Sequence, residues 1–122
     1  MKNDIDKSHL FQDLRAIIGE KNILTTKWSK LPYCKGWRYG KGEALAVARP
    51  GTLFEIWRII QICVDLDIIV IMQAANTGLT GGSTPYGDDY DRPIIVINTM
   101  RVSHIHIIDD GKQIVGLAGS TL

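Results

Sequence analysis

The sequence predicts an α/β fold (α+β in the wider sense), and three observations support this prediction. An apolar run at residues 44–48 and a β-branched run at residues 68–72 flank a stretch with helical periodicity. Strand, helix and strand in this order form a βαβ unit. A third apolar run follows at residues 94–98, after a long polar loop. The N-terminal region adds one more segment with apolar residues at helical spacing.

The N-terminal segment predicts an amphipathic helix over residues 8–18. Ser8 is its expected N-cap, and Gly19 is expected to end it in a left-handed turn. Five apolar side chains form one stripe along this helix: Leu10, Phe11, Leu14, Ile17 and Ile18.

Residues 20–43 show no clear periodicity and are predicted to be irregular. The part KLPYCKGWRYGKGE is rich in glycine, lysine and aromatic residues. It suits either a basic patch that contacts a nucleotide or a linker whose aromatic side chains pack onto the next unit, and we favour the linker. We therefore divide the chain into residues 1–39, a helix and linker, and residues 40–122, the main domain.

The βαβ unit has clear boundaries. Pro50 and Gly51 stop the first strand, and Thr52 and Glu55 have the spacing of a capping box, so the helix is expected to begin there. It should run to about Leu66, and its apolar circumference predicts that it is covered on more than one side. The second strand, at residues 68–72, has the continuous apolar character of a buried parallel strand.

The C-terminal third predicts three further strands. Residues 94–98 form a third buried strand, and HIHIID then alternates in polarity. DDGK at residues 109–112 is a hairpin turn, after which QIVGLAG is expected to pair as the last strand.

The loop after residue 73 consists mainly of small polar residues. Gly78, Gly81 and Gly82 have no Cβ atom, so the backbone there can approach a ligand closely. Successive main-chain amides form a concavity that attracts phosphate oxygens. Neutral side-chain donors surround them: Asn76, Thr77, Thr80, Ser83 and Thr84. This composition suits a pyrophosphate that is held by neutral donors rather than by lysine.

The position of the loop supports a binding role. A loop that follows a parallel strand lies at the carboxyl edge of the sheet, where α/β proteins bind ligands. The alternative is a flexible connection, but such connections need only about 2–6 residues, and this one is several times longer. Neither GxxxxGK[ST] nor GxGxxG is present, so a P-loop and the ordinary dinucleotide fingerprint are both disfavoured.

Composition excludes several classes of function. With 14 basic and 13 acidic residues, the net charge of +1 gives no case for binding nucleic acid. No signal peptide or apolar run of membrane-spanning length is present, so we expect a soluble, cytoplasmic segment. Cys34 and Cys63 lack metal-ligand spacing and are expected to be buried and reduced.

Other polar residues give weaker signals. His104 and His106 can face one side of a strand as two metal ligands, but a solvated strand face is favoured, and no metal site is predicted. DDYD at residues 88–91 lacks the spacing of a calcium loop and is expected to be a solvated turn. Arg92 and Arg101 can contact a phosphate, although ordinary surface positions are favoured.

Three segments resemble one known family: ALAVARPGTLFEIWRI, MQAANTGLTGGSTP and DYDRPIIVINTMR. They are similar to the start of the FAD-binding domain of the bacterial quinone-dependent D-lactate dehydrogenases. These enzymes belong to the vanillyl-alcohol oxidase / p-cresol methylhydroxylase (PCMH) group of flavoproteins. The similarity covers almost the whole chain. The wider group usually has a Gly-Gly-Thr type of loop, whereas AANTG at residues 74–78 is typical of the lactate enzymes.

The resemblance implies a cofactor site and a fold. The FAD pyrophosphate and its neighbourhood would be contacted by Ala74, Ala75, Asn76, Thr77, Gly78, Gly82 and Ser83. Residues 40–122 would be the N-terminal part of a two-subdomain PCMH-type FAD-binding domain.

The resemblance also implies an activity for the whole protein. D-Lactate would be oxidised to pyruvate, with a hydride passing from C2 to flavin N5 and the electrons then to membrane quinone. The family's enzymes are several times longer, so the residues that bind lactate are expected beyond Leu122, and no catalytic residue is assigned. The protein would lie peripherally on the cytoplasmic side of the bacterial inner membrane, with membrane contact through regions outside this chain. The alternatives are an enzyme for glycolate or 2-hydroxyglutarate, or an inactive remnant.

Overall fold

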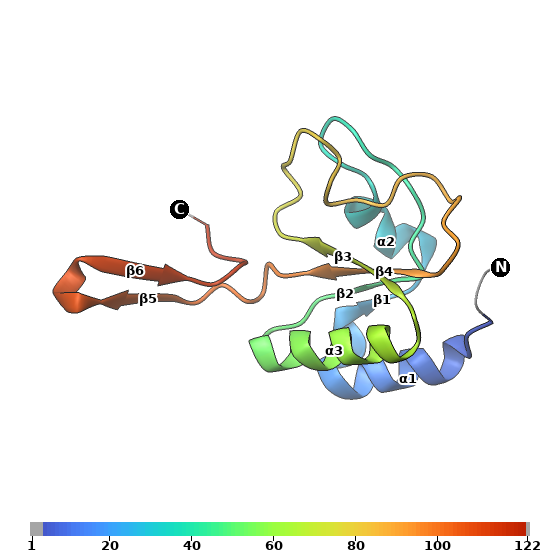
Figure 1. Cartoon of the computed structure of the whole chain (residues 1–122), viewed down its shortest axis with the longest axis horizontal. Coiled ribbons are helices and arrows are strands. Elements are labelled where there is room, and N and C mark those ends of the chain that lie inside the picture. The colour runs from blue at the N-terminus through green and yellow to red at the C-terminus, as the bar shows by residue number, and fades with distance from the viewer. Residues whose placement is uncertain (1–3, 122) are drawn as a thin grey trace.

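A computed structural model describes residues 4–121 and shows a four-stranded sheet with helices on both faces (Figure 1). The strand order is β1 (Ile23–Leu24), β2 (Ala46–Ala48), β4 (Ile94–Asn98) and β3 (Ile69–Gln73). β1 pairs antiparallel with β2, whereas β2, β4 and β3 are parallel. This architecture confirms the predicted α/β class.

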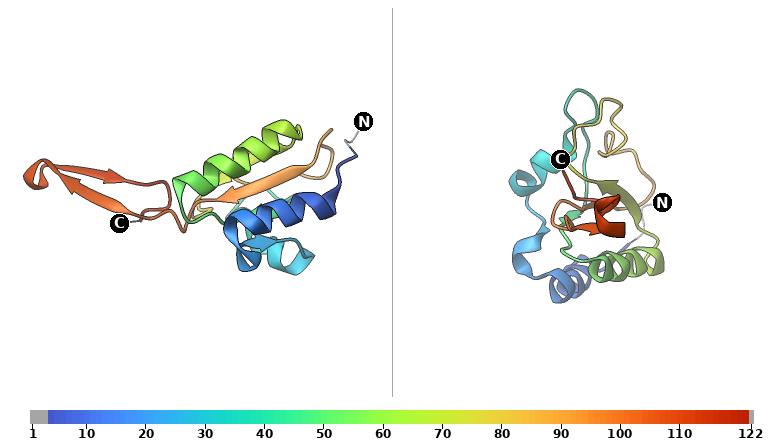
Figure 2. Two further views of the ribbon diagram at one scale, coloured as in Figure 1. Left: turned by 90° about the horizontal axis from the view of Figure 1, so that it is seen from below. Right: turned by 90° about the vertical axis from the view of Figure 1, so that its left-hand side faces the viewer.

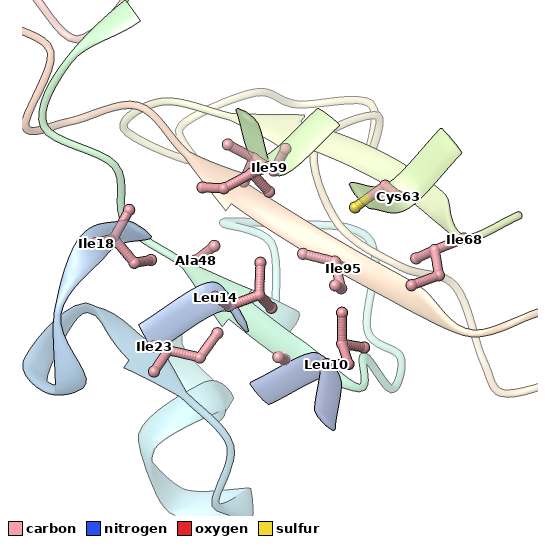
Figure 3. Packing of buried hydrophobic residues seen from close by; sticks show 11 residues of the cluster. Leu10, Leu14, Ile18, Ile23, Ala48, Ile59, Cys63, Ile68 and Ile95 are labelled. Carbon is pink, nitrogen blue, oxygen red and sulfur yellow. The ribbon is translucent and has the colours of Figure 1, made fainter. Parts of the chain in front are cut away.

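Helices α1 (Lys7–Ile18) and α3 (Leu53–Asp65) lie side by side on one face of the sheet, as both views in Figure 2 show. Leu14 from α1, Ile59 from α3 and Ile95 from β4 are fully buried in the core between the layers (Figure 3). The boundary at residue 39/40 stays a prediction. Nevertheless, α1 and β1 from the first segment share this core with the strands of the second.

The ends of α1 differ in part from the prediction. The helix begins at Lys7, and its N-cap is Asp6 rather than Ser8, because the Asp6 carboxylate accepts the main-chain N–H of His9 at 3.2 Å. Gly19 does end the helix with a positive φ of 83°, but its ψ of 155° is extended rather than left-handed helical. The N–H of Gly19 still caps the helix by donating to the carbonyl of Arg15.

The segment predicted to be irregular contains a short 3-10 turn at Glu20–Asn22, strand β1 and helix α2 (Lys27–Cys34). Helix α2 covers the second face of the sheet, where Cys34 packs with Val47 and Val96. The prediction that the aromatic residues of this segment pack onto the next unit is correct only for Tyr33, because the other aromatic side chains are exposed: Trp28, Trp37 and Tyr39.

The strand order corrects the expectation that the second strand of the βαβ unit is buried. β4 lies between β2 and β3, so the two strands that α3 connects are not neighbours. β3 is therefore an edge strand, and Met72 is exposed, whereas all five residues of β4 are buried. The buried-strand prediction is confirmed for residues 94–98 and wrong for much of β3.

Helix α3 is covered on one side only within residues 4–121. Ile59 and Cys63 face the core, but Phe54, Trp57 and Val64 are more than half exposed, which contradicts the expected coverage on several sides. The phenyl ring of Phe54 lies beside the Trp57 indole, with ring centroids 5.5 Å apart.

The predicted capping box at the start of α3 is confirmed. The Thr52 hydroxyl accepts the N–H of Glu55 at 3.1 Å, and the Glu55 carboxylate accepts the N–H of Thr52 at 3.2 Å. Two main-chain donors that the helix leaves unpaired are thereby satisfied.

We expect Thr52→Ala to lower the free energy of unfolding by about 1 kcal/mol, because the N–H of Glu55 loses its acceptor. Thr52→Ser keeps a hydroxyl in the same place and is expected to retain most of that stability. Chemical denaturation of both variants measures the difference. Equal losses for alanine and serine would show that the cap contributes nothing.

The last two strands form a separate hairpin that projects from the sheet (Figure 1). β5 (Ile105–Ile108) and β6 (Gln113–Gly116) pair antiparallel across a turn at Asp109–Gly111, as the sequence predicts. Both strands are exposed along their length.

Candidate cofactor loop

The loop at residues 74–93 connects the carboxyl end of β3 to the start of β4. It runs over the face of the sheet that α2 also covers (Figure 1). Residues 74–84, which we call the cofactor loop, begin at the carboxyl edge, as the sequence predicts. Their small side chains leave the main chain accessible: Ala74, Ala75, Thr77, Gly78 and Gly82 are all exposed.

The main-chain amides of the cofactor loop have few partners inside the protein. Among the hydrogen bonds between residues 4–121, none has the N–H of residues 75–83 as its donor. Unpaired N–H groups need either water or a ligand. A row of nine such donors along an exposed loop can therefore donate hydrogen bonds to the oxygens of an anion.

Space for a ligand exists at Gly78. A Cβ atom built on this residue would find no heavy atom of residues 4–121 within 4 Å, so the volume beside its Cα is open. Gly81 serves a different purpose, since its φ of 76° is in the left-handed region and its Cα lies against the main chain of Gly40. Thus Gly78 faces open space, and Gly81 allows two loops to touch.

Two of the expected ligand residues have side chains that are already engaged. The Asn76 amide donates to the carbonyl of Lys35 at 2.8 Å and to that of Pro32 at 3.4 Å. The Ser83 hydroxyl donates to the Asn76 side-chain oxygen at 3.0 Å. The contribution of these two residues to a ligand site therefore rests first on their main-chain groups. Direct contact of the seven predicted residues with a cofactor stays a prediction.

Two polar residues at this edge were not singled out from the sequence. Gln73 and Asn98 end β3 and β4, are almost fully buried, and are joined by a hydrogen bond of 3.0 Å from the Asn98 amide to the Gln73 oxygen. Buried polar groups need partners, so a polar residue at the end of each apolar run is the signal that could have revealed them.

Residues 36–42 lie beside residues 86–87 of the loop that connects β3 to β4. The N–H of Glu43 donates to the carbonyl of Gly87 at 3.0 Å, and the N–H of Gly87 donates to that of Lys41 at 2.9 Å. The two loops line a hollow of about 530 Å³ with the exposed rings of Trp37, Tyr39 and Tyr86. The segment YCKGWRYGKG, residues 33–42, thus lies beside residues 86–87, and through Gly40 it also contacts Gly81 of the cofactor loop.

The remaining candidate histidines and arginines contact one another, acidic side chains or the main chain. The rings of His104 and His106 stack with centroids 6.3 Å apart, and no group of three or more potential metal ligands occurs within residues 4–121. Arg92 pairs with Asp67 at 2.7 Å and with Asp91 at 3.1 Å, and the Arg101 guanidinium donates to a main-chain carbonyl.

Both cysteines are buried and unpaired with each other, as predicted. Burial raises the pKa of the Cys63 thiol to about 12 from its ordinary value of 9.0. Burial is also the largest cause of a raised pKa at Cys34, where the positive charge of Lys30 acts in the opposite direction.

The Cys63 pKa sets a pH dependence of stability. Between about pH 9 and 12 the unfolded chain releases a thiol proton that the folded chain keeps, so the free energy of unfolding is expected to fall as pH rises through this window. Denaturation of the wild type and of Cys63→Ala at several pH values isolates this effect. Identical slopes for the two proteins would contradict the assignment.

Solved structures with this fold are known. The chain superimposes on p-cresol methylhydroxylase with substrate bound at a TM-score of 0.72 and 18% identity, over 93% of this chain and 22% of that one. An alkyldihydroxyacetonephosphate synthase gives 0.73 and 14%, over 88% and 22%. These similarities show that the chain shares its fold with a part of each of these enzymes. No protein-family profile matches the sequence.

Curated relatives are much closer in sequence. Quinone-dependent D-lactate dehydrogenase of Haemophilus influenzae is 54% identical over 113 residues, which is 93% of this chain and 20% of the relative. The enzymes of the same name from Corynebacterium glutamicum and Escherichia coli are 49% and 44% identical, over 88% and 96% of this chain. The chain belongs to this family and spans about a fifth of the length of these relatives. No helix within residues 4–121 is long and apolar enough to cross a bilayer.

Proposed function

We propose that this chain is the FAD pyrophosphate-binding portion of a quinone-dependent D-lactate dehydrogenase. The strongest support is the sequence identity of 44–54% to enzymes of that name over at least 88% of the chain. In this function the whole protein oxidises D-lactate to pyruvate and passes the electrons through FAD to quinone. Its place is peripheral, on the cytoplasmic side of the bacterial inner membrane, with membrane contact through regions outside this chain.

The residues present fit the diphosphate of FAD. The N–H groups of residues 75–83 have no acceptor among the described residues, and the space beside Gly78 is open. Main-chain amides in series form a fixed set of partial positive charges for phosphate oxygens. No lysine occurs between Lys41 and Lys112, so the cofactor loop itself brings neutral donors only.

In the reaction, these residues bind FAD and orient it. Bound FAD supplies the two-electron chemistry of hydride acceptance. The cofactor loop fixes the diphosphate, and Gln73, buried at the end of β3 and hydrogen-bonded to Asn98, fixes the start of the loop relative to the sheet. No proton transfer is assigned to any residue of this chain.

A second candidate substrate follows from weaker relatives. Glycolate oxidase subunit GlcD of Escherichia coli is 30% identical over 67% of this chain. D-2-Hydroxyglutarate dehydrogenase of Arabidopsis thaliana is 28% identical over 79%. Both names point to 2-hydroxy acids, so the oxidised group is the same and only the remainder of the substrate differs.

The test uses the complete natural chain that contains these residues. The purified protein should show flavin absorbance and release FAD on denaturation. Under anaerobic conditions D-lactate should bleach the flavin faster than glycolate or D-2-hydroxyglutarate at equal concentration, and a quinone should restore the colour. Absence of flavin after titration with FAD would overturn the proposal. Faster bleaching by glycolate or D-2-hydroxyglutarate would show that this acid, and not D-lactate, is the substrate.

A further inference from the structure

Gln73 connects three parts of the structure from a buried position. Its side-chain amide donates to the carbonyl of Tyr33 in α2 at 2.8 Å and to that of Ser83 at 2.9 Å. Its oxygen accepts from Asn98 in β4. Asn98 also donates to the carbonyl of Ala74 at 3.0 Å. The first and last parts of the cofactor loop are thus held at one point, at the edge of the sheet.

Asn76 also joins the end of α2 to the cofactor loop through both ends of its side-chain amide. Its amide donates to the carbonyls of Lys35 and Pro32, and its oxygen accepts from the Ser83 hydroxyl. Its backbone has a φ of 56°, in the left-handed region that asparagine tolerates better than most residues. A left-handed backbone conformation and a side-chain anchor therefore coincide at one residue.

Both residues satisfy carbonyls at the C-terminal end of α2. Pro32 and Tyr33 lie in the last turn of the helix, where main-chain carbonyls have no partner within the helix, and Lys35 follows directly as the C-cap. The side-chain amides of Gln73 and Asn76 supply the missing donors. Helix α2 is thus the support against which the cofactor loop is held.

We propose that Gln73 and Asn76 are positioning residues that fix the shape of the cofactor loop, before any ligand is bound, by capping the end of α2. This inference rests on the proposed function, because it assigns the purpose of the network to FAD binding. A loop of small residues loses much conformational freedom when it closes on a ligand. The network removes part of that freedom in advance, so that less binding free energy is spent on ordering the loop.

The test compares Asn76→Ala with Thr77→Ala in the complete natural chain. Thr77 is exposed, and its side chain has no hydrogen-bond partner among the described residues, so it is the matched control for exchange in the FAD-free protein. FAD affinity is compared between Asn76→Ala and the wild type, because Thr77 is itself a predicted FAD contact. Hydrogen exchange of the FAD-free protein reports the order of residues 74–84, FAD titration gives the dissociation constant, and the visible flavin spectrum at saturation reports the bound geometry.

Asn76→Ala should speed exchange across the cofactor loop in the FAD-free protein and raise the FAD dissociation constant roughly tenfold. The saturated flavin spectrum should stay unchanged, because the contacts to the ligand remain. Thr77→Ala should leave exchange in the FAD-free protein unchanged. Ser83→Thr, which keeps the hydroxyl bonded to Asn76, should bind FAD more tightly than Ser83→Ala.

Two results would overturn the assignment. Unchanged exchange in FAD-free Asn76→Ala, together with weaker FAD binding, would make Asn76 a direct ligand of the cofactor. Faster exchange with an unchanged dissociation constant would make the network purely structural. A wild-type protein that shows the ordered loop but binds no FAD would overturn the proposed function itself and this proposal with it. That outcome is read from the wild type alone, before any variant is compared.

Discussion

Gly78→Val is expected to abolish FAD retention while the protein stays folded. The isopropyl group would occupy the open space beside the loop, where the diphosphate is proposed to lie. Displacing two hydrogen bonds to a charged group, at about 1.5–3 kcal/mol each, corresponds to a roughly 100-fold or greater loss of affinity. No described residue has a heavy atom within 4 Å of the new Cβ, and Gly78 is outside the left-handed region, so stability should change by no more than about 0.5 kcal/mol.

A matched control for this variant is available in the hairpin. Gly116 in β6 is exposed, does not have a left-handed φ, and a Cβ there would lie 3.6 Å from the Ser120 side chain. Gly116→Val should therefore retain FAD. Absorbance of the purified proteins and thermal unfolding measure the two effects separately. Stoichiometric flavin in Gly78→Val would show that the cofactor loop is not the diphosphate site.

Ile95→Ala is expected to cause the largest loss of stability, about 2–5 kcal/mol. Ile95 is 0% exposed on the central strand β4, and its side chain packs in the core beneath α1 and α3 (Figure 3). Truncation removes buried methyl groups and leaves a cavity that the surrounding helices fill only in part.

Ile107→Ala makes the same chemical change on strand β5, where the side chain is 69% exposed. It should lower the free energy of unfolding by well under 1 kcal/mol, because little apolar surface is returned to water. Chemical denaturation of both variants gives the comparison. Equal losses at the two positions would contradict the burial on which the fold description depends.

The features that could be predicted from the sequence are those set by local chemistry. The capping box of Thr52 and Glu55 fixes the start of α3 by groups three residues apart. The continuous apolar run of β4 identifies a fully buried strand, and the glycines after β3 identify an accessible main chain at the sheet edge.

The remaining features depend on residues that are distant in the chain. Helix α2 contains Pro32, lies among glycines and lysines, and has its polar carbonyls satisfied by Gln73 and Asn76, about forty residues later. The position of β4 between β2 and β3 is likewise a matter of long-range pairing. The cofactor loop was recognisable as a candidate, but its support was not, because the support is a set of long-range hydrogen bonds.

We propose that unpaired main-chain N–H groups between residues 74 and 84 hold a diphosphate without a cation from the loop. The most direct measurement is a crystal structure of the complete natural chain with FAD bound. We expect diphosphate oxygens within hydrogen-bonding distance of several of these N–H groups, beside Gly78. A diphosphate held elsewhere by lysine or arginine side chains, with residues 74–84 facing solvent, would contradict it.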